Sequence, residues 1–199
     1  MLKQNSELRA EARVALQGKW LMAAVATLIL GGVIGGLSAI PFIGVLVMLF
    51  TLPIMYGYVI VMLNVFKGGD VDFGILFEGF QDYGRILSTK LLQVVYTFLW
   101  SLLLFIPGVI KYYSYAMTDF ILKEEPEMKN NAAIEKSMTM MEGNKMKLFM
   151  LDLSFIGWAI LCLFTFGIGY LFLQSYRGVS YAAFYNDLKA QQENVEVNI

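Results

Sequence analysis

The side chains best suited to chemistry in this chain are Asp119, Asp152 and Arg177, which all lie within apolar segments. Ionised groups in such segments are costly, and they tend to pair with one another and to mark function. At 1.5 Å per helical residue they lie roughly 5, 8 and 17 Å from the polar ends of their segments. Arg177 is the deepest, but its long side chain can reach toward the two carboxylates. We therefore predict a buried polar cluster, which acts either as a structural clamp or as a substrate or ion site. The two carboxylates are also the one candidate acid–base pair.

Few other chemistries fit the sequence. The chain has no His and a single Cys, Cys162, so the usual zinc, haem and Cys–His arrangements lack their ligands. The glycine motifs also lack the serine or aspartate of an intramembrane protease, because Gly167-Ile168-Gly169 continues with Tyr170 and Gly178-Val179-Ser180 with Tyr181. We expect no metal and no cofactor, and we rank an intramembrane enzyme last among the function classes.

Composition indicates a membrane protein. Hydrophobic residues make up 58% of the chain and charged residues 16%, against about a quarter charged in soluble domains. The run from Trp20 to Phe66 contains no charged residue and is too long for a core helix. The net charge of -1 argues against a broadly basic nucleic-acid surface. We expect an all-α, polytopic membrane protein with membrane lipids as its first partners and no nucleic acid.

The apolar pattern predicts about six membrane segments arranged as three helical hairpins. Pro41 and Gly44 mark the first turn, Pro107 and Gly108 the second, and residues 165–167 the third. The predicted segments are residues 20–39, 42–66, 91–106, 108–122, 147–164 and 167–188.

The basic residues favour treating residues 91–122 as a hairpin. This choice leaves every Lys and Arg except Lys111 and Arg177 on the cytoplasmic side, whereas a single crossing places six lysines outside. The two segments are only about 22 to 24 Å long, so the pair either forms two short spans or dips into the bilayer as a re-entrant hairpin. With an even number of crossings, both termini are expected in the cytoplasm.

Surface elements are predicted between the hairpins. Residues 6–19 form either a short amphipathic helix on the membrane surface or a solvated arm, and residues 71–88 and 128–142 form in-plane helices that rest on lipid or on the bundle. Residues 189–199 are a polar tail, which we expect to be disordered. Two overlapping G-x-x-x-G pairs in the first span favour close approach of another helix: Gly31, Gly32, Gly35 and Gly36.

Five sequence blocks carry a family resemblance: Ile106–Lys111, Tyr113–Met117, Ser137–Gly143, Leu153–Trp158 and Ala182–Tyr185. Together they resemble the bacterial integral membrane "domain of unknown function 975" family over nearly the whole chain. The Ile-Pro-Gly turn followed by an Ala/Ser-containing surface helix is more loosely similar to the membrane domain found beside some glycerophosphodiester phosphodiesterases. These resemblances imply a multi-pass protein of the bacterial inner membrane, and they do not imply phosphodiesterase activity.

Three function classes follow from these observations. The first is a non-catalytic membrane scaffold that organises lipids, or membrane or cytoplasmic protein partners, through its cytoplasmic surface helices. The second is a small-solute or ion transporter or channel that uses the intramembrane charged residues. The third is an intramembrane lipid-active enzyme.

Overall fold

The computed structural model describes residues 2–38 and 44–197, so the predicted turn at Pro41 lies outside the described residues. Over these residues the chain is helical and contains no strand, which confirms the all-α prediction. The elements in order are α1 (Asn5–Ala15), α2 (Trp20–Ser38), α3 (Gly44–Phe66), η1 (Phe73–Phe80, a 3-10 helix), α4 (Tyr83–Leu103), α5 (Phe105–Ser114), α6 (Thr118–Glu124), α7 (Asn131–Met140), α8 (Lys145–Leu153), α9 (Ile156–Leu163) and α10 (Ile168–Val197).

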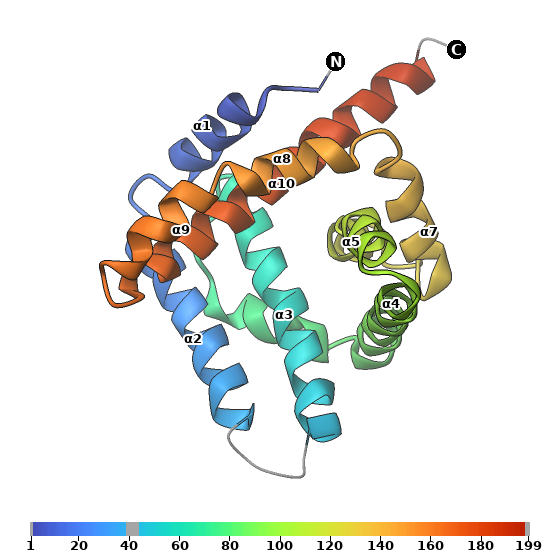
Figure 1. Cartoon of the computed structure of the whole chain (residues 1–199), viewed down its shortest axis with the longest axis horizontal. Helices are drawn as coiled ribbons and strands as arrows, with labels where there is room; N and C mark the ends of the chain where they lie inside the picture. Colours follow the sequence, from blue (N-terminus) through green and yellow to red (C-terminus); the bar gives the residue numbers. More distant parts are fainter. Residues whose placement is uncertain (1, 39–43, 198–199) are drawn as a thin grey trace.

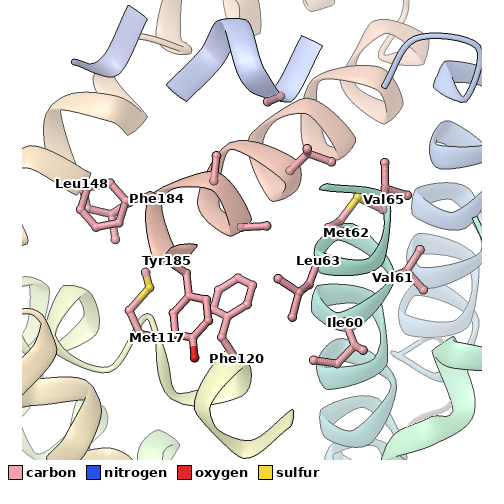
Figure 2. Packing of buried hydrophobic residues seen from close by; sticks show 14 of the residues in the cluster. Ile60, Val61, Met62, Leu63, Val65, Met117, Phe120, Leu148, Phe184 and Tyr185 are labelled. Carbon is pink, nitrogen blue, oxygen red and sulfur yellow. The ribbon is translucent and has the colours of Figure 1, made fainter. Parts of the chain in front are cut away.

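The long helix α10 is the centre of the fold. It contacts α1, α2, α3 and α9, and its middle turns lie in the hydrophobic core. Figure 2 shows Tyr185 of α10 beside Phe120 of α6, and Phe184 of α10 beside Leu148 of α8. The Phe120 and Tyr185 rings stack with centroids 4.9 Å apart. The prediction of a disordered tail from residue 189 is wrong, because α10 continues to Val197 and Lys189 is held by an ion pair to Glu124.

The three predicted hairpins do not form one parallel bundle. In Figure 1, α2 and α3 run side by side down the view, α4 and α5 are seen nearly end-on, and α9 with the start of α10 points to the left. Their outer parts are apolar and exposed; Leu102, Ile106, Leu163 and Phe166, for example, are 67, 71, 76 and 99% exposed. The hairpins therefore diverge from a shared core and carry apolar surface outward.

Two segments are long and apolar enough to cross a membrane, Val47–Phe66 and Lys145–Leu163. A third candidate arises if Asn5–Ala15 and Trp20–Gly36, which meet at an angle of 98°, are counted together. Within the described residues, length and composition thus support two to three spans, and the six predicted spans are not confirmed. A break in the helices explains part of the difference, since residues 108–122 are divided between the two short helices α5 and α6.

The second hairpin turns earlier than predicted. The helix breaks at Leu104, whose backbone is extended, and Pro107 lies in the first turn of α5 rather than at the reversal. Proline is tolerated there because the first backbone N–H groups of a helix have no intrahelical acceptor. Gly108 permits close helix packing, since a Cβ on it would lie 2.9 Å from the Cα of Ser101 on α4. Pro107 and Gly108 therefore shape the returning helix and its contact with α4.

Residues 71–88 do not form one in-plane helix. They divide into η1, which packs on α3, and the first turns of α4. Two glycines permit this contact: a Cβ on Gly57 would lie 2.2 Å from the carbonyl oxygen of Leu76, and one on Gly79 would lie 2.4 Å from that of Pro53. The aromatic and aliphatic stripe of this region therefore covers its own protein.

The other two predicted surface helices are present as α1 and α7. The apolar face of α1, including Leu8 and Ala12, is fully buried, and the helix contacts α10, α3 and α8. On α7, Ala133, Ile134 and Ser137 are buried, and α7 packs on α6 and α4. Both helices cover protein with one side and leave the other side exposed.

Candidate functional site

The first buried ion pair joins Lys90 of α4 to Asp119 of α6. Lys90 Nζ lies 3.0 Å from both carboxylate oxygens of Asp119, and each residue is only 8% exposed. Lys90 directly precedes the segment predicted for residues 91–106, but α4 begins at Tyr83 and carries Lys90 into the protein interior. The pair is compact and nearly dry, and its two formal charges cancel.

The second ion pair joins Arg177 of α10 to Asp152 of α8 in bidentate geometry. Arg177 Nε and Nη2 lie 2.8 and 2.9 Å from the two oxygens of Asp152. The hydroxyls of Tyr113 and Tyr181 also donate to Asp152, at 2.9 and 2.7 Å, and the guanidinium lies 5.3 Å from the centroid of the Tyr181 ring. Four donors thus surround one carboxylate, which is the arrangement expected of a firmly held charge.

The structure corrects the predicted three-residue cluster. Arg177 and Asp152 are paired, whereas Asp119 is bound by Lys90 and belongs to a separate pair. Because each carboxylate already accepts hydrogen bonds from its own cation, Asp119 and Asp152 do not form an acid–base dyad of the kind that shares a proton. The sequence signal that was missed is Lys90, the one basic residue between Arg85 and Lys111.

Asp119 and Arg177 nevertheless border the same cavity, which has a volume of about 240 Å³. Its polar lining includes Lys90, Gln93 and Tyr181, and its apolar lining comes mainly from α3. The side-chain oxygen of Gln93 is buried there without a hydrogen-bond partner in the described part of the chain. Arg177 also borders a second cavity of about 370 Å³, together with Asp152 and Tyr113.

A third ionic centre lies at the carboxyl end of α6, in the part of the molecule around α6 and α7 that we call the polar end. Glu124 accepts hydrogen bonds from Lys67 and Lys189, both at 2.6 Å, and from the Tyr185 hydroxyl at 2.9 Å. Burial opposes ionisation of this carboxyl, but these donors together lower its pKa to about 2. Glu124 thereby ties α6 to α10 and to the end of α3.

The residues on either side of Glu124 extend this network. Lys123 pairs with Glu78 of η1, and Glu125 pairs with Lys136 of α7. Three consecutive residues at the carboxyl end of α6 therefore bind four other parts of the chain. Sequence analysis did not single out these residues, because a run of charges before Pro126 is typical of an ordinary solvated turn.

The remaining predicted sites show no further chemistry. A Cβ on Gly31, Gly32, Gly35 or Gly36 would meet no atom within 4 Å in the part of the chain that the structure describes, so close packing at these glycines has no partner there. Within the same residues, no group of three or more acidic, His or Cys side chains is arranged to hold a metal ion.

One comparison with known proteins gives a match. Residues 102–192 match the family described as "Protein of unknown function (DUF975)". All five sequence blocks that carried the predicted resemblance lie inside this segment, and the resemblance to this family is confirmed over residues 102–192 rather than over nearly the whole chain. The looser similarity to a membrane domain beside glycerophosphodiester phosphodiesterases is not shown. No curated protein and no solved structure matches the chain.

Proposed function

We propose that this chain, which carries the DUF975 family match over residues 102–192, is a non-catalytic membrane scaffold of the bacterial inner membrane. In this proposal the three diverging hairpins lie in the bilayer and the polar end, around α6 and α7, lies in the cytoplasm. Lipids contact the hairpins, and partner proteins contact the polar end.

The observation that carries this proposal is the separation of apolar and ionic surfaces. Large exposed hydrophobic side chains concentrate on the outer parts of the hairpins, as at Phe98, Leu102, Leu163 and Phe164. Soluble monomers rarely expose contiguous apolar patches of more than a few hundred Å². Lipid is therefore the natural solvent of these parts, and the ionic network around Glu124 belongs in water.

Contacts at the polar end support a shared side for residues 67–90 and 123–147. Lys123 pairs with Glu78, and Arg85 donates from Nη1 to the carbonyl oxygens of Leu122 and Met128, both at 3.0 Å. The two segments therefore cannot lie on opposite sides of a bilayer. Since both are rich in Lys and Arg, we assign them to the cytoplasm.

The scaffold role is tested by photo-cross-linking in native membranes. A photoreactive amino acid at Thr139, which borders a groove of about 500 Å³ between α7 and α10, should give a discrete protein adduct. The same probe at Phe98, on the apolar part of α4, should give lipid adducts only. The absence of protein adducts at Thr139, combined with solute flux in proteoliposomes, would refute the scaffold role and support a transporter.

A transporter is the second candidate, because Arg177 borders both cavities and its partner Asp152 borders one of them. Transport through this region predicts flux of small ions across proteoliposomes that contain the purified protein. Fluxes of H⁺, Na⁺, K⁺ and Cl⁻ should be measured with the wild type and with Arg177→Met. Flux that depends on Arg177 would support transport, and leakage equal to that of empty liposomes would exclude it for these ions.

A further inference from the structure

A second site lies outside the ion pairs, in a groove between α1 and the α9–α10 hairpin. The groove has a volume of about 640 Å³, and its lining includes Arg9, Arg13, Trp20, Trp158, Leu161 and Tyr176. We propose that it binds one anionic phospholipid, with the phosphate at the two arginines and an acyl chain along the hairpin. This inference rests on the membrane location given under the proposed function.

The two arginines are the reason for an anionic ligand. Arg9 and Arg13 are one helical turn apart and so lie on the same side of α1. Neither forms a salt bridge with a carboxylate among the described residues. Most of the other Lys and Arg residues do form one. Arg9 makes one long hydrogen bond, 3.5 Å from Nη1 to the carbonyl oxygen of Ser154. Its Nε is buried and has no partner in the described part of the chain.

An unpartnered buried donor is costly, and a phosphate supplies the acceptors that are missing. Guanidinium groups bind phosphate oxygens in planar, often bidentate geometry, with two charge-assisted hydrogen bonds. A carboxylate of the protein could have served this purpose, but none lines the groove among the residues that the structure describes. The groove therefore has a built cationic end with nothing of its own to neutralise it.

The rest of the groove fits a hydrocarbon chain rather than a free anion. Beyond the arginines, Trp20 and Tyr176 pack edge to face with centroids 5.8 Å apart, and the Tyr176 hydroxyl donates to the carbonyl oxygen of Arg9 at 3.0 Å. From Tyr176 to Gly169 the wall follows α10 for roughly 10 Å, at 1.5 Å per residue. Trp158 and Leu161 on the opposite wall are about half exposed, which opens the groove sideways toward lipid.

The position of α1 matches the depth of a lipid headgroup. The helix meets Trp20–Gly36 at 98°, so a membrane-crossing α2 would hold α1 nearly parallel to the bilayer surface. Tryptophan and tyrosine side chains are enriched at this level. The phosphate at Arg9 and Arg13 and the chain along α9 and α10 thus follow the natural orientation of a phospholipid.

The test uses tryptophan quenching in detergent micelles. Trp20 and Trp158 line the groove, so the background variant is Trp100→Phe, which removes the one tryptophan outside it. Brominated phosphatidylglycerol and brominated phosphatidylcholine are titrated separately at low lipid-to-detergent ratios. We expect tighter quenching by phosphatidylglycerol, by about fivefold for each arginine.

Two double variants locate the effect. Arg9→Gln with Arg13→Gln should abolish the preference for phosphatidylglycerol, while the buried face of α1 keeps the fold. Lys129→Gln with Lys145→Gln removes the same charge outside the groove, from residues that form no ion pair with the described residues, and should keep the preference. Circular dichroism and gel filtration check that both variants are folded.

Three results would overturn the proposal: a preference retained in the arginine variant, an equal loss in the lysine control, or complete displacement of the lipid by millimolar inorganic phosphate. The last result would mean that the site takes a free anion and has no use for the acyl chain. If the protein resists alkaline carbonate extraction but shows no lipid preference, that result contradicts this inference alone. A protein that carbonate removes from membranes contradicts the proposed function instead.

Discussion

Removing one member of the Arg177–Asp152 pair should destabilise the fold by about 2 kcal/mol. Unit charges about 4 Å apart attract by about 4 kcal/mol at an effective dielectric constant of 20. The Arg177 side chain is 34% exposed and the Asp152 side chain 14%, so solvent screens part of this attraction and we take about half of it. Arg177→Met and Asp152→Asn each leave the partner charge partly buried without its counter-ion.

A double-mutant cycle isolates the pair. Free energies of unfolding are measured in mild detergent by titration with sodium dodecyl sulfate for the wild type, both single variants and the double variant. The double variant should lose less than the sum of the single losses by at least about 1 kcal/mol, because it leaves no lone charge. Strictly additive losses would show that the two residues are not partners.

A second cycle separates the observed arrangement from the cluster predicted from sequence. Combining Arg177→Met with Asp119→Asn should give nearly additive losses, because Asp119 is bound by Lys90. Combining Lys90→Met with Asp119→Asn should again show coupling. Coupling of equal size between residues 119 and 177 would refute the assignment of two separate pairs.

Three further predictions test other parts of the fold. The pKa of Glu124 is lowered from 4.5 to about 2, so its ionised contacts stabilise the protein fully above about pH 4.5 and are lost as the pH falls toward 2. Relative to Glu124→Gln, the wild type should lose about 1 to 2 kcal/mol of unfolding free energy across this window. This figure is discounted for solvent screening because the lysine partners of Glu124 are nearly half exposed. Gly79→Ala should destabilise the contact of η1 with α3 by about 1 to 3 kcal/mol, whereas Gly84→Ala, with no atom within 4 Å of the new Cβ, should change stability by less than about 1 kcal/mol in the same unfolding assay. In a Cys162→Ala background, Glu127→Cys should resist a membrane-impermeant thiol reagent in intact cells and react after permeabilisation, because the proposed topology puts it in the cytoplasm. Labelling in intact cells would instead place α7 on the outer side of the membrane.

Sequence alone identified the helical class and the third predicted turn, because both depend on local residue patterns. The turn at residues 165–167 is an example: Phe166 and Gly167 have positive φ angles and separate α9 from α10. Sequence also identified Asp152 and Arg177, since a charge in an apolar run is visible without coordinates. Their bidentate geometry, and the two tyrosine hydroxyls on Asp152, depend on how α5, α8 and α10 meet.

The errors share a physical cause, which is that tertiary contacts decide between local alternatives. The polar composition of residues 189–197 is typical of a disordered tail, but Lys189 and Tyr185 hold α10 to Glu124. The amphipathic stripe of residues 71–88 is typical of one in-plane helix that rests on lipid or on the bundle, but Gly57 and Gly79 let the backbone of the separate η1 approach α3. Neither contact has a signature within its own segment.

If the hairpins lie in lipid as proposed, polar contacts explain how they can be held together although they diverge. Apolar helix surfaces gain little from contacting each other there, because lipid tails are equally apolar. The first hairpin is tied to α10 by Thr27, whose hydroxyl lies 2.9 Å from those of Tyr58 and Ser175. The second is tied to the third where Tyr113 donates to Asp152. Since these two links share no residue, loss of Asp152 should loosen the α4–α5 hairpin while leaving α2 and α3 docked on α10.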